Sequence, residues 1–127
     1  MPLSGKSILV IEDEPLIAME AESSLKDAGA TSIKMVNSVS AAHDALNGDK
    51  FDAAVVNLRL ADGDGSPLVG MLSKHGIPVV VTTGFSADQA PVARAAAFLE
   101  KPYRESDLIE TITRLTKTWR RSAPQSN

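Results

Sequence analysis

The sequence contains no cysteine and few aromatic residues: one Trp, one Tyr and three Phe among 127 residues. The missing thiol excludes disulfide bonds, thiol nucleophiles and thiolate metal sites. A chain without cysteine also fits a reducing compartment, where disulfides do not persist. Any chemistry of this protein must therefore use carboxylates, amides, hydroxyls, amines or imidazoles.

Long apolar runs and an excess of positive charge are missing as well. No apolar run approaches the roughly 18 residues that a membrane-spanning helix needs. The formal net charge is −3, whereas proteins that bind nucleic acid or anionic membrane surfaces carry basic patches. We therefore expect a cytoplasmic protein that binds neither nucleic acid nor membrane.

The composition that is present is typical of one globular domain. Hydrophobic residues make up 43% of the chain and charged residues 23%, and the length suffices for one hydrophobic core. Residues 122–127 contain no large apolar side chain that could anchor them to that core. We expect a single domain over residues 1–121 and a disordered tail over residues 122–127.

Short apolar runs alternate with segments of helical spacing. The runs, rich in β-branched residues, cover residues 7–11, 32–36, 52–56, 77–82 and 97–99. Between and after them apolar residues recur every three or four positions, most clearly at Leu108, Ile112, Leu115 and Trp119. Gly29, Gly48 and Gly76 follow three of the helical segments and are expected to end them in the left-handed conformation.

This alternation predicts an α/β fold of (βα)5 type, with helices on both faces of a doubly wound, parallel five-stranded sheet. The order 2-1-3-4-5, known from flavodoxin-like folds, is the natural expectation for five such units. The first, third and fourth runs are apolar nearly throughout, as strands covered on both faces are.

Polar side chains follow four of the expected strands. They are Glu12 and Asp13 after the first, Asn57 after the third, Thr83 after the fourth and Lys101 after the fifth. Taken singly, each also has an ordinary structural explanation, such as a helix start, a turn or a solvated surface. Because ligands of such sheets bind beyond the carboxyl ends of the strands, the set together predicts a cation- and phosphate-binding site.

These residues resemble the motifs of response-regulator receiver domains of two-component signalling. The matching stretches are residues 8–14, 52–60, 62–65, 78–84 and 101–103, and the resemblance covers residues 5–118. It implies that Glu12, Asp13, position 57 and the backbone carbonyl of Arg59 hold Mg²⁺. It also implies that Thr83 and Lys101 bind phosphoryl oxygens, that Phe98 is an aromatic switch, and that a histidine kinase or phosphotransfer protein is the partner.

Two features depart from the family pattern. Asn57 stands where the phospho-accepting aspartate is expected, and a neutral amide lacks the anionic nucleophile of a carboxylate. Mg²⁺ binding should weaken too, because one negative charge beside the ion is lost. The stretch between Gly84 and Phe98 is short and contains Pro91, so the fourth helix should be short or partly unwound.

We therefore expect a stand-alone receiver module, a monomer or weak homodimer and not an enzyme, that is not phosphorylated and acts by protein–protein docking. The first alternative is a normal phospho-accepting receiver in which Asn57 is an engineered substitution. The second is an enzyme of flavodoxin-like architecture, which the lack of an aromatic residue to stack on flavin after the third strand disfavours.

Overall fold

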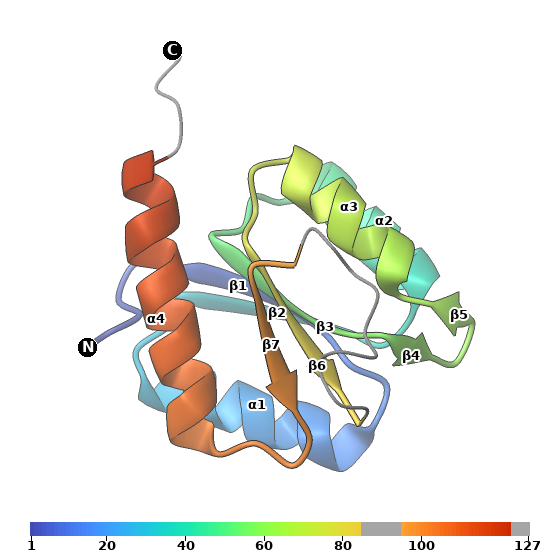
Figure 1. Ribbon diagram of the computed structural model, residues 1–127, viewed down its shortest axis with the longest axis horizontal. Helices are drawn as coiled ribbons and strands as arrows, with labels where there is room; N and C mark the ends of the chain where they lie inside the picture. The colour runs from blue at the N-terminus through green and yellow to red at the C-terminus, as the bar shows by residue number, and fades with distance from the viewer. Residues whose placement is uncertain (85–94, 123–127) are drawn as a thin grey trace.

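The computed structural model describes residues 1–84 and 95–122 of the chain, the last five of them by their backbone alone, and has an α/β fold (Figure 1). The strands are β1 (Ser7–Ile11), β2 (Ser32–Val36), β3 (Ala53–Asn57), β4 (Arg59–Leu60), β5 (Gly63–Asp64), β6 (Val79–Thr83) and β7 (Ala97–Glu100). The helices are α1 (Pro15–Asp27), α2 (Val39–Gly48), α3 (Ser66–Lys74) and α4 (Glu105–Ser122).

The main sheet has five strands in the order β2-β1-β3-β6-β7, and all neighbouring pairs are parallel. Counted along this sheet, the order is 2-1-3-4-5, which confirms the predicted flavodoxin-like topology. The three inner strands, β1, β3 and β6, are those that the sequence marks as apolar nearly throughout. Helices on both faces of the sheet bury these three strands, and a strand that is covered on both sides has to be apolar.

Two hydrophobic cores lie on opposite faces of the sheet. One, which contains Leu9, Val56, Leu72 and Val81, is covered by α2 and α3. The other contains Val10, Leu25, Leu108 and Ile112 and is covered by α1 and α4. Figure 1 shows the two helix pairs on opposite sides of the strands. Since successive side chains of a strand point to opposite faces, each inner strand contributes to both cores.

Several predicted boundaries need correction. β3 begins and ends one residue later than predicted and so includes Asn57. β6 begins at Val79, two residues later than predicted, because Ile77 and Pro78 lie before the residues that pair with the neighbouring strands. Gly29 and Gly76 have positive φ, as predicted. The expectation for Gly48 is wrong: it is the last residue of α2 and does not have a positive φ, and the following Asp49 is extended. A small antiparallel hairpin, β4–β5, was not predicted.

Some predictions fall on residues outside the described part of the chain. The fourth helix, expected between Gly84 and Phe98 and containing Pro91, lies largely within residues 85–94. The expected tail over residues 122–127 also falls outside the described residues, apart from Ser122, at which α4 ends. The side chain of Trp119 is likewise not described, whereas Leu108 and Ile112 of the same stripe are fully buried.

Candidate functional site

The carboxyl ends of β1, β3, β6 and β7 bring the predicted polar side chains together. Glu12 directly follows β1, Asn57 ends β3, Thr83 ends β6 and Lys101 follows β7. The Lys101 backbone N–H donates a 2.8 Å hydrogen bond to the carbonyl oxygen of Thr83, which ties the two strand ends together. The site thus arises from strand order, since β1, β3 and β6 are neighbours in the sheet.

Asn57 is the centre of this site and is 7% exposed. Its side-chain Nδ2 donates to Glu12 Oε2 at 3.2 Å, to Asp13 Oδ1 at 3.2 Å and to the backbone oxygen of Arg59 at 2.7 Å. All three partners accept hydrogen bonds and have no proton to donate when the acids are ionised. The amide must therefore present its NH2 group, and not its oxygen, to this side of the site.

Glu12 is buried, with 4% of its surface exposed, and both of its oxygens are engaged. Lys101 Nζ lies 3.1 Å from Oε1. Oε2 accepts from the backbone N–H of Glu14 at 3.0 Å as well as from Asn57. Such a buried carboxylate is tolerated because a cation and hydrogen-bond donors compensate for the water that it has lost.

A pocket of about 410 Å³ opens beside these residues. Asp13, Asn57, Arg59, Thr83 and Lys101 line it, together with Glu14, Leu58 and Gly84. Five of the predicted site residues therefore line one pocket, whereas Glu12 is not among its lining residues. Its walls offer both signs of charge, which suits a small polar group better than an apolar ligand.

The loop between β3 and α3 holds the backbone of the site in place. Gly65 donates its N–H to the carbonyl oxygen of Leu58 at 2.7 Å, and a Cβ at Gly65 would lie 2.7 Å from the carbonyl oxygen of Asn57. Glycine is therefore required by close approach, since φ of Gly65 is an ordinary −79°. The sequence motif over residues 62–65 does not by itself predict this close approach.

Asp62 is a second residue of this loop whose role was missed. Its carboxylate accepts from the backbone N–H groups of Val39 at 2.8 Å and of Ser40 at 3.2 Å, and so caps the start of α2 beside Ser38. These two hydrogen bonds, of which the one from Val39 has the larger effect, lower the pKa of the Asp62 carboxyl group. The cap links the β3–α3 loop to α2, and its partner is too distant in sequence to be predicted from spacing.

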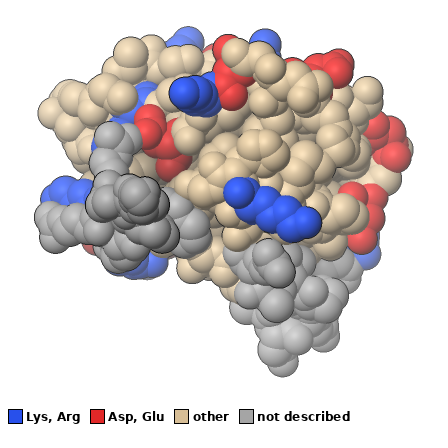
Figure 2. Space-filling view, turned by 90° about the horizontal axis from the view of Figure 1, so that it is seen from above, with Lys and Arg blue, Asp and Glu red and all other residues tan. Residues whose placement is uncertain are grey.

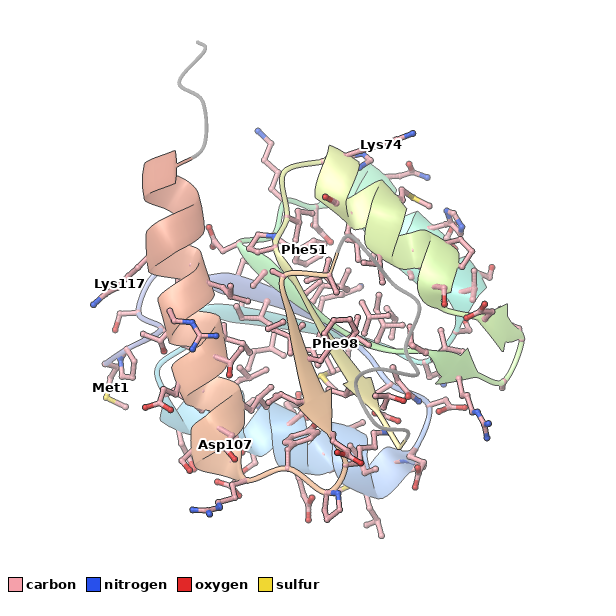
Figure 3. All side chains as sticks on the ribbon, viewed as in Figure 1. Met1, Phe51, Lys74, Phe98, Asp107 and Lys117 are labelled. Carbon is pink, nitrogen blue, oxygen red and sulfur yellow. The ribbon has the colours of Figure 1, made fainter. Side chains whose placement is uncertain are left out.

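The two threonines at the end of β6 face opposite ways. Thr83 lines the pocket, whereas Thr82 pairs in register with Asn57 and Leu99. The Thr82 hydroxyl is buried without a hydrogen-bond partner within the part of the chain that the structure describes. Phe98 is half-buried and packs against the core under α2 and α3, on the α3 side of β7 (Figure 3).

Tyr103 follows the cis Lys101–Pro102 bond and packs against the core under α1 and α4. Burial raises the pKa of its phenol to about 12, and the negative charges of Glu12 and Glu20 add to this effect. The phenol is therefore neutral at physiological pH. Sequence reasoning used this residue only as part of a motif.

The donor set of the site does not fit a magnesium ion in this arrangement. Within residues 1–84 and 95–122 there is no group of three or more His, Asp or Glu side chains that could hold a metal. Glu12 and Asp13 are two oxygen ligands, but the third side chain between them, Asn57, offers nitrogen-bound hydrogens. Mg²⁺ requires oxygen ligands in near-octahedral geometry.

Charge and hydropathy add two observations. Figure 2 shows Lys and Arg mixed with Asp and Glu on the visible face, without a continuous basic patch among the coloured residues. None of the helices, as far as their residues are described, combines the length and apolar character that crossing a membrane requires.

The chain is similar to known regulatory proteins and to solved receiver structures. Transcriptional regulatory protein PdtaR of Mycobacterium tuberculosis is 30% identical over 112 residues, which cover 84% of this chain and 55% of PdtaR. The chain thus spans about half of that relative. A CheY-like receiver domain protein of Methanospirillum hungatei superposes with a TM-score of 0.85 at 22% identity, covering 93% of this chain and 98% of the other.

The receiver domain of sensor histidine kinase PA1611 of Pseudomonas aeruginosa also shares the fold. It superposes with a TM-score of 0.79 at 20% identity, over 90% of this chain and 99% of its own, and carries a magnesium ion in its active-site cleft. The sequence model of the response regulator receiver domain matches residues 8–113. That match spans most of the chain, and the chain therefore belongs to the response-regulator receiver domain family of two-component signalling.

Proposed function

We propose that this chain is a receiver module that does not accept a phosphoryl group at position 57 and acts by docking to other proteins. One observation carries the proposal: the side chain at the end of β3 is a neutral amide whose nitrogen is hydrogen-bonded to Glu12, Asp13 and the Arg59 carbonyl. Phosphoryl transfer needs a positioned nucleophile. An amide held by its NH2 group toward two carboxylates supplies none, so the chain is not an enzyme of this type.

The other site residues keep roles that the same geometry supports. Thr83 and Lys101 line the pocket beside Asn57, where a hydroxyl and an ammonium group could bind an anion. Lys101 instead pairs with Glu12 here. Phe98, one strand away from Thr83, is proposed to report movements of that strand end. Mg²⁺ binding at Glu12, Asp13 and the Arg59 carbonyl is proposed to be weakened, because the side chain of Asn57 contributes no third carboxylate.

Docking is supported by apolar side chains next to the site. Leu16 and Met19 of α1 are 75% and 63% exposed, which is unusual for large hydrophobic residues near one another on a helix. We propose that a histidine kinase or a phosphotransfer protein covers them, while the chain itself is a monomer or a weak homodimer. The substitution Leu16→Glu should then weaken that association in a calorimetric titration without lowering the stability of the fold.

The proposal is tested by mass spectrometry of the intact protein after incubation with Mg²⁺ and acetyl phosphate. We expect no change for the native chain and a gain of about 80 mass units, one phosphoryl group, for Asn57→Asp. Asn47→Asp, on the exposed surface of α2, is the control for the added charge. Stoichiometric gain by the native chain would refute the proposal.

The result for Asn57→Asp also bears on the alternatives. Gain by this variant alone is what an otherwise competent receiver with an engineered Asn57 predicts, and the natural gene then decides between the two. No gain by either protein would mean that more of the site than position 57 has changed. A flavodoxin-like enzyme would instead reveal itself by turnover of a phosphate ester or by a bound yellow cofactor.

A further inference from the structure

We infer that the side-chain NH2 group of Asn57 takes the place of the divalent cation in this site, so that the site is closed to Mg²⁺ and not merely short of one ligand. This inference rests on the proposed function only in that both concern Asn57. It is carried by the set of atoms that the amide contacts.

Those atoms are two carboxylate oxygens and one backbone carbonyl oxygen, from Glu12, Asp13 and Arg59. A cluster of this kind has three oxygens converging on one point and no proton among them, which is the environment of a cation. Nδ2 of Asn57 lies at that point, 2.7 to 3.2 Å from each oxygen. Its two hydrogens carry the partial positive charge that holds the oxygens together.

The carboxylate of Glu12 also has other hydrogen-bond and ion-pair partners within the chain. Glu12 has Lys101 on Oε1, and the Glu14 N–H and the Asn57 amide on Oε2, so its negative charge is already compensated by groups of the chain. Since Glu12 is 4% exposed and Asn57 is 7% exposed, these contacts are shielded from water and are stronger than on the surface. An entering Mg²⁺ would have to displace Nδ2 and break three hydrogen bonds, two of them to charged groups.

An amide that occupies the cation position predicts a result that the mere loss of one carboxylate ligand does not predict. If Asn57 only fails to contribute a carboxylate, removing its amide cannot improve Mg²⁺ binding. If the amide fills the place of the cation, Asn57→Ala opens that place while Glu12, Asp13 and the Arg59 carbonyl remain. The alanine variant must then bind Mg²⁺ more tightly than the native chain does, although it has one polar group fewer.

The experiment is a calorimetric titration of the full chain with MgCl2, repeated as urea unfolding at increasing Mg²⁺. We expect no saturable heat and no shift of the unfolding midpoint for the native chain up to about 20 mM Mg²⁺. Asn57→Ala should bind at least about tenfold more tightly than native, the equivalent of one hydrogen bond to a charged group. Asn57→Asp should bind at least about a hundredfold more tightly, because it adds a charge.

Asn47→Asp is the matched control and should behave as the native chain. Should Asn57→Asp fail to fold without metal, the uncharged Asn57→Ala still decides the question. Native affinity equal to or above that of Asn57→Ala overturns the inference, because the amide would then be a ligand or irrelevant. Absence of binding by both variants overturns it too, since the remaining oxygens would not form a cation site. Neither result touches the mass test, which judges the proposed function separately.

Discussion

The ion pair between Lys101 and Glu12 offers a quantitative test of how the site is held together. Replacing Lys101 by Met keeps most of the aliphatic side chain and removes the charge. At the observed 3.1 Å and an effective dielectric constant of about 20, the attraction amounts to about 5 kcal/mol before desolvation. Glu12 is 3% exposed in its side chain and Lys101 is 16% exposed, so the pair is mostly buried.

Breaking a buried pair typically costs about 3–5 kcal/mol, because the remaining charge has no partner. Here Glu12 keeps the N–H groups of Asn57 and Glu14, and water can reach the vacated position through the pocket. We therefore expect a loss of about 2 kcal/mol in the free energy of unfolding. With a urea slope of about 1.5 kcal/mol per molar, the midpoint should fall by about 1.3 M.

A control is available within the same chain. Lys26 lies 3.7 Å from Glu22 on α1, with side chains that are 66% and 37% exposed. Exposed pairs of this kind contribute at most about 0.5 kcal/mol, so Lys26→Met should leave the midpoint almost unchanged. Equal effects of the two substitutions would refute the reasoning, because burial would then not decide the strength of the Lys101 pair.

Three further substitutions or titrations test other parts of the structure. Gly65→Ala should lower stability by about 1–3 kcal/mol in urea unfolding because its Cβ meets a backbone oxygen 2.7 Å away, whereas Gly70→Ala, in open space within α3, should raise it by about 0.5–1 kcal/mol. Thr82→Val should stabilise by about 1 kcal/mol, since its hydroxyl is buried without a partner among the described residues; Thr116→Val, which loses a hydrogen bond, should not. The pKa of the Tyr103 phenol is raised to about 12, so the stability that the neutral phenol contributes is complete below pH 10 and is lost as pH rises from about 10 toward 12. The reason is that the unfolded chain releases this proton at lower pH than the folded chain does. An ultraviolet titration that shows ordinary phenol ionisation near pH 10 in the folded protein would contradict this prediction.

Much of the fold could be predicted because its signals are local and mutually consistent. Each strand is a short apolar run, and the runs at β1, β3 and β6 differ from those at β2 and β7 in the way that inner and edge strands differ. The left-handed glycines Gly29 and Gly76 follow their helices. The expectation for Gly48 was wrong, because the helix ends there through the extended backbone of Asp49, which requires no positive φ at the glycine.

The candidate site could be predicted as a set of residues but not as a set of contacts. Strand order brings Glu12, Asn57, Thr83 and Lys101 to one edge of the sheet, and order follows from sequence. The direction in which the Asn57 amide points depends on three oxygens from separate segments. The same holds for Asp62, which caps α2 from 22 and 23 residues away, and no local pattern encodes such a partner.

The most direct test of the central claim is a two-dimensional ¹H–¹⁵N NMR spectrum of the native chain before and after addition of Mg²⁺ with acetyl phosphate. We expect the backbone amide signals of Glu12, Asp13, Thr83 and Lys101 to stay where they are, and the side-chain NH2 signals of Asn57 to remain protected from exchange with water. Shifts of these signals in the native chain, matching those of Asn57→Asp under the same conditions, would contradict the account.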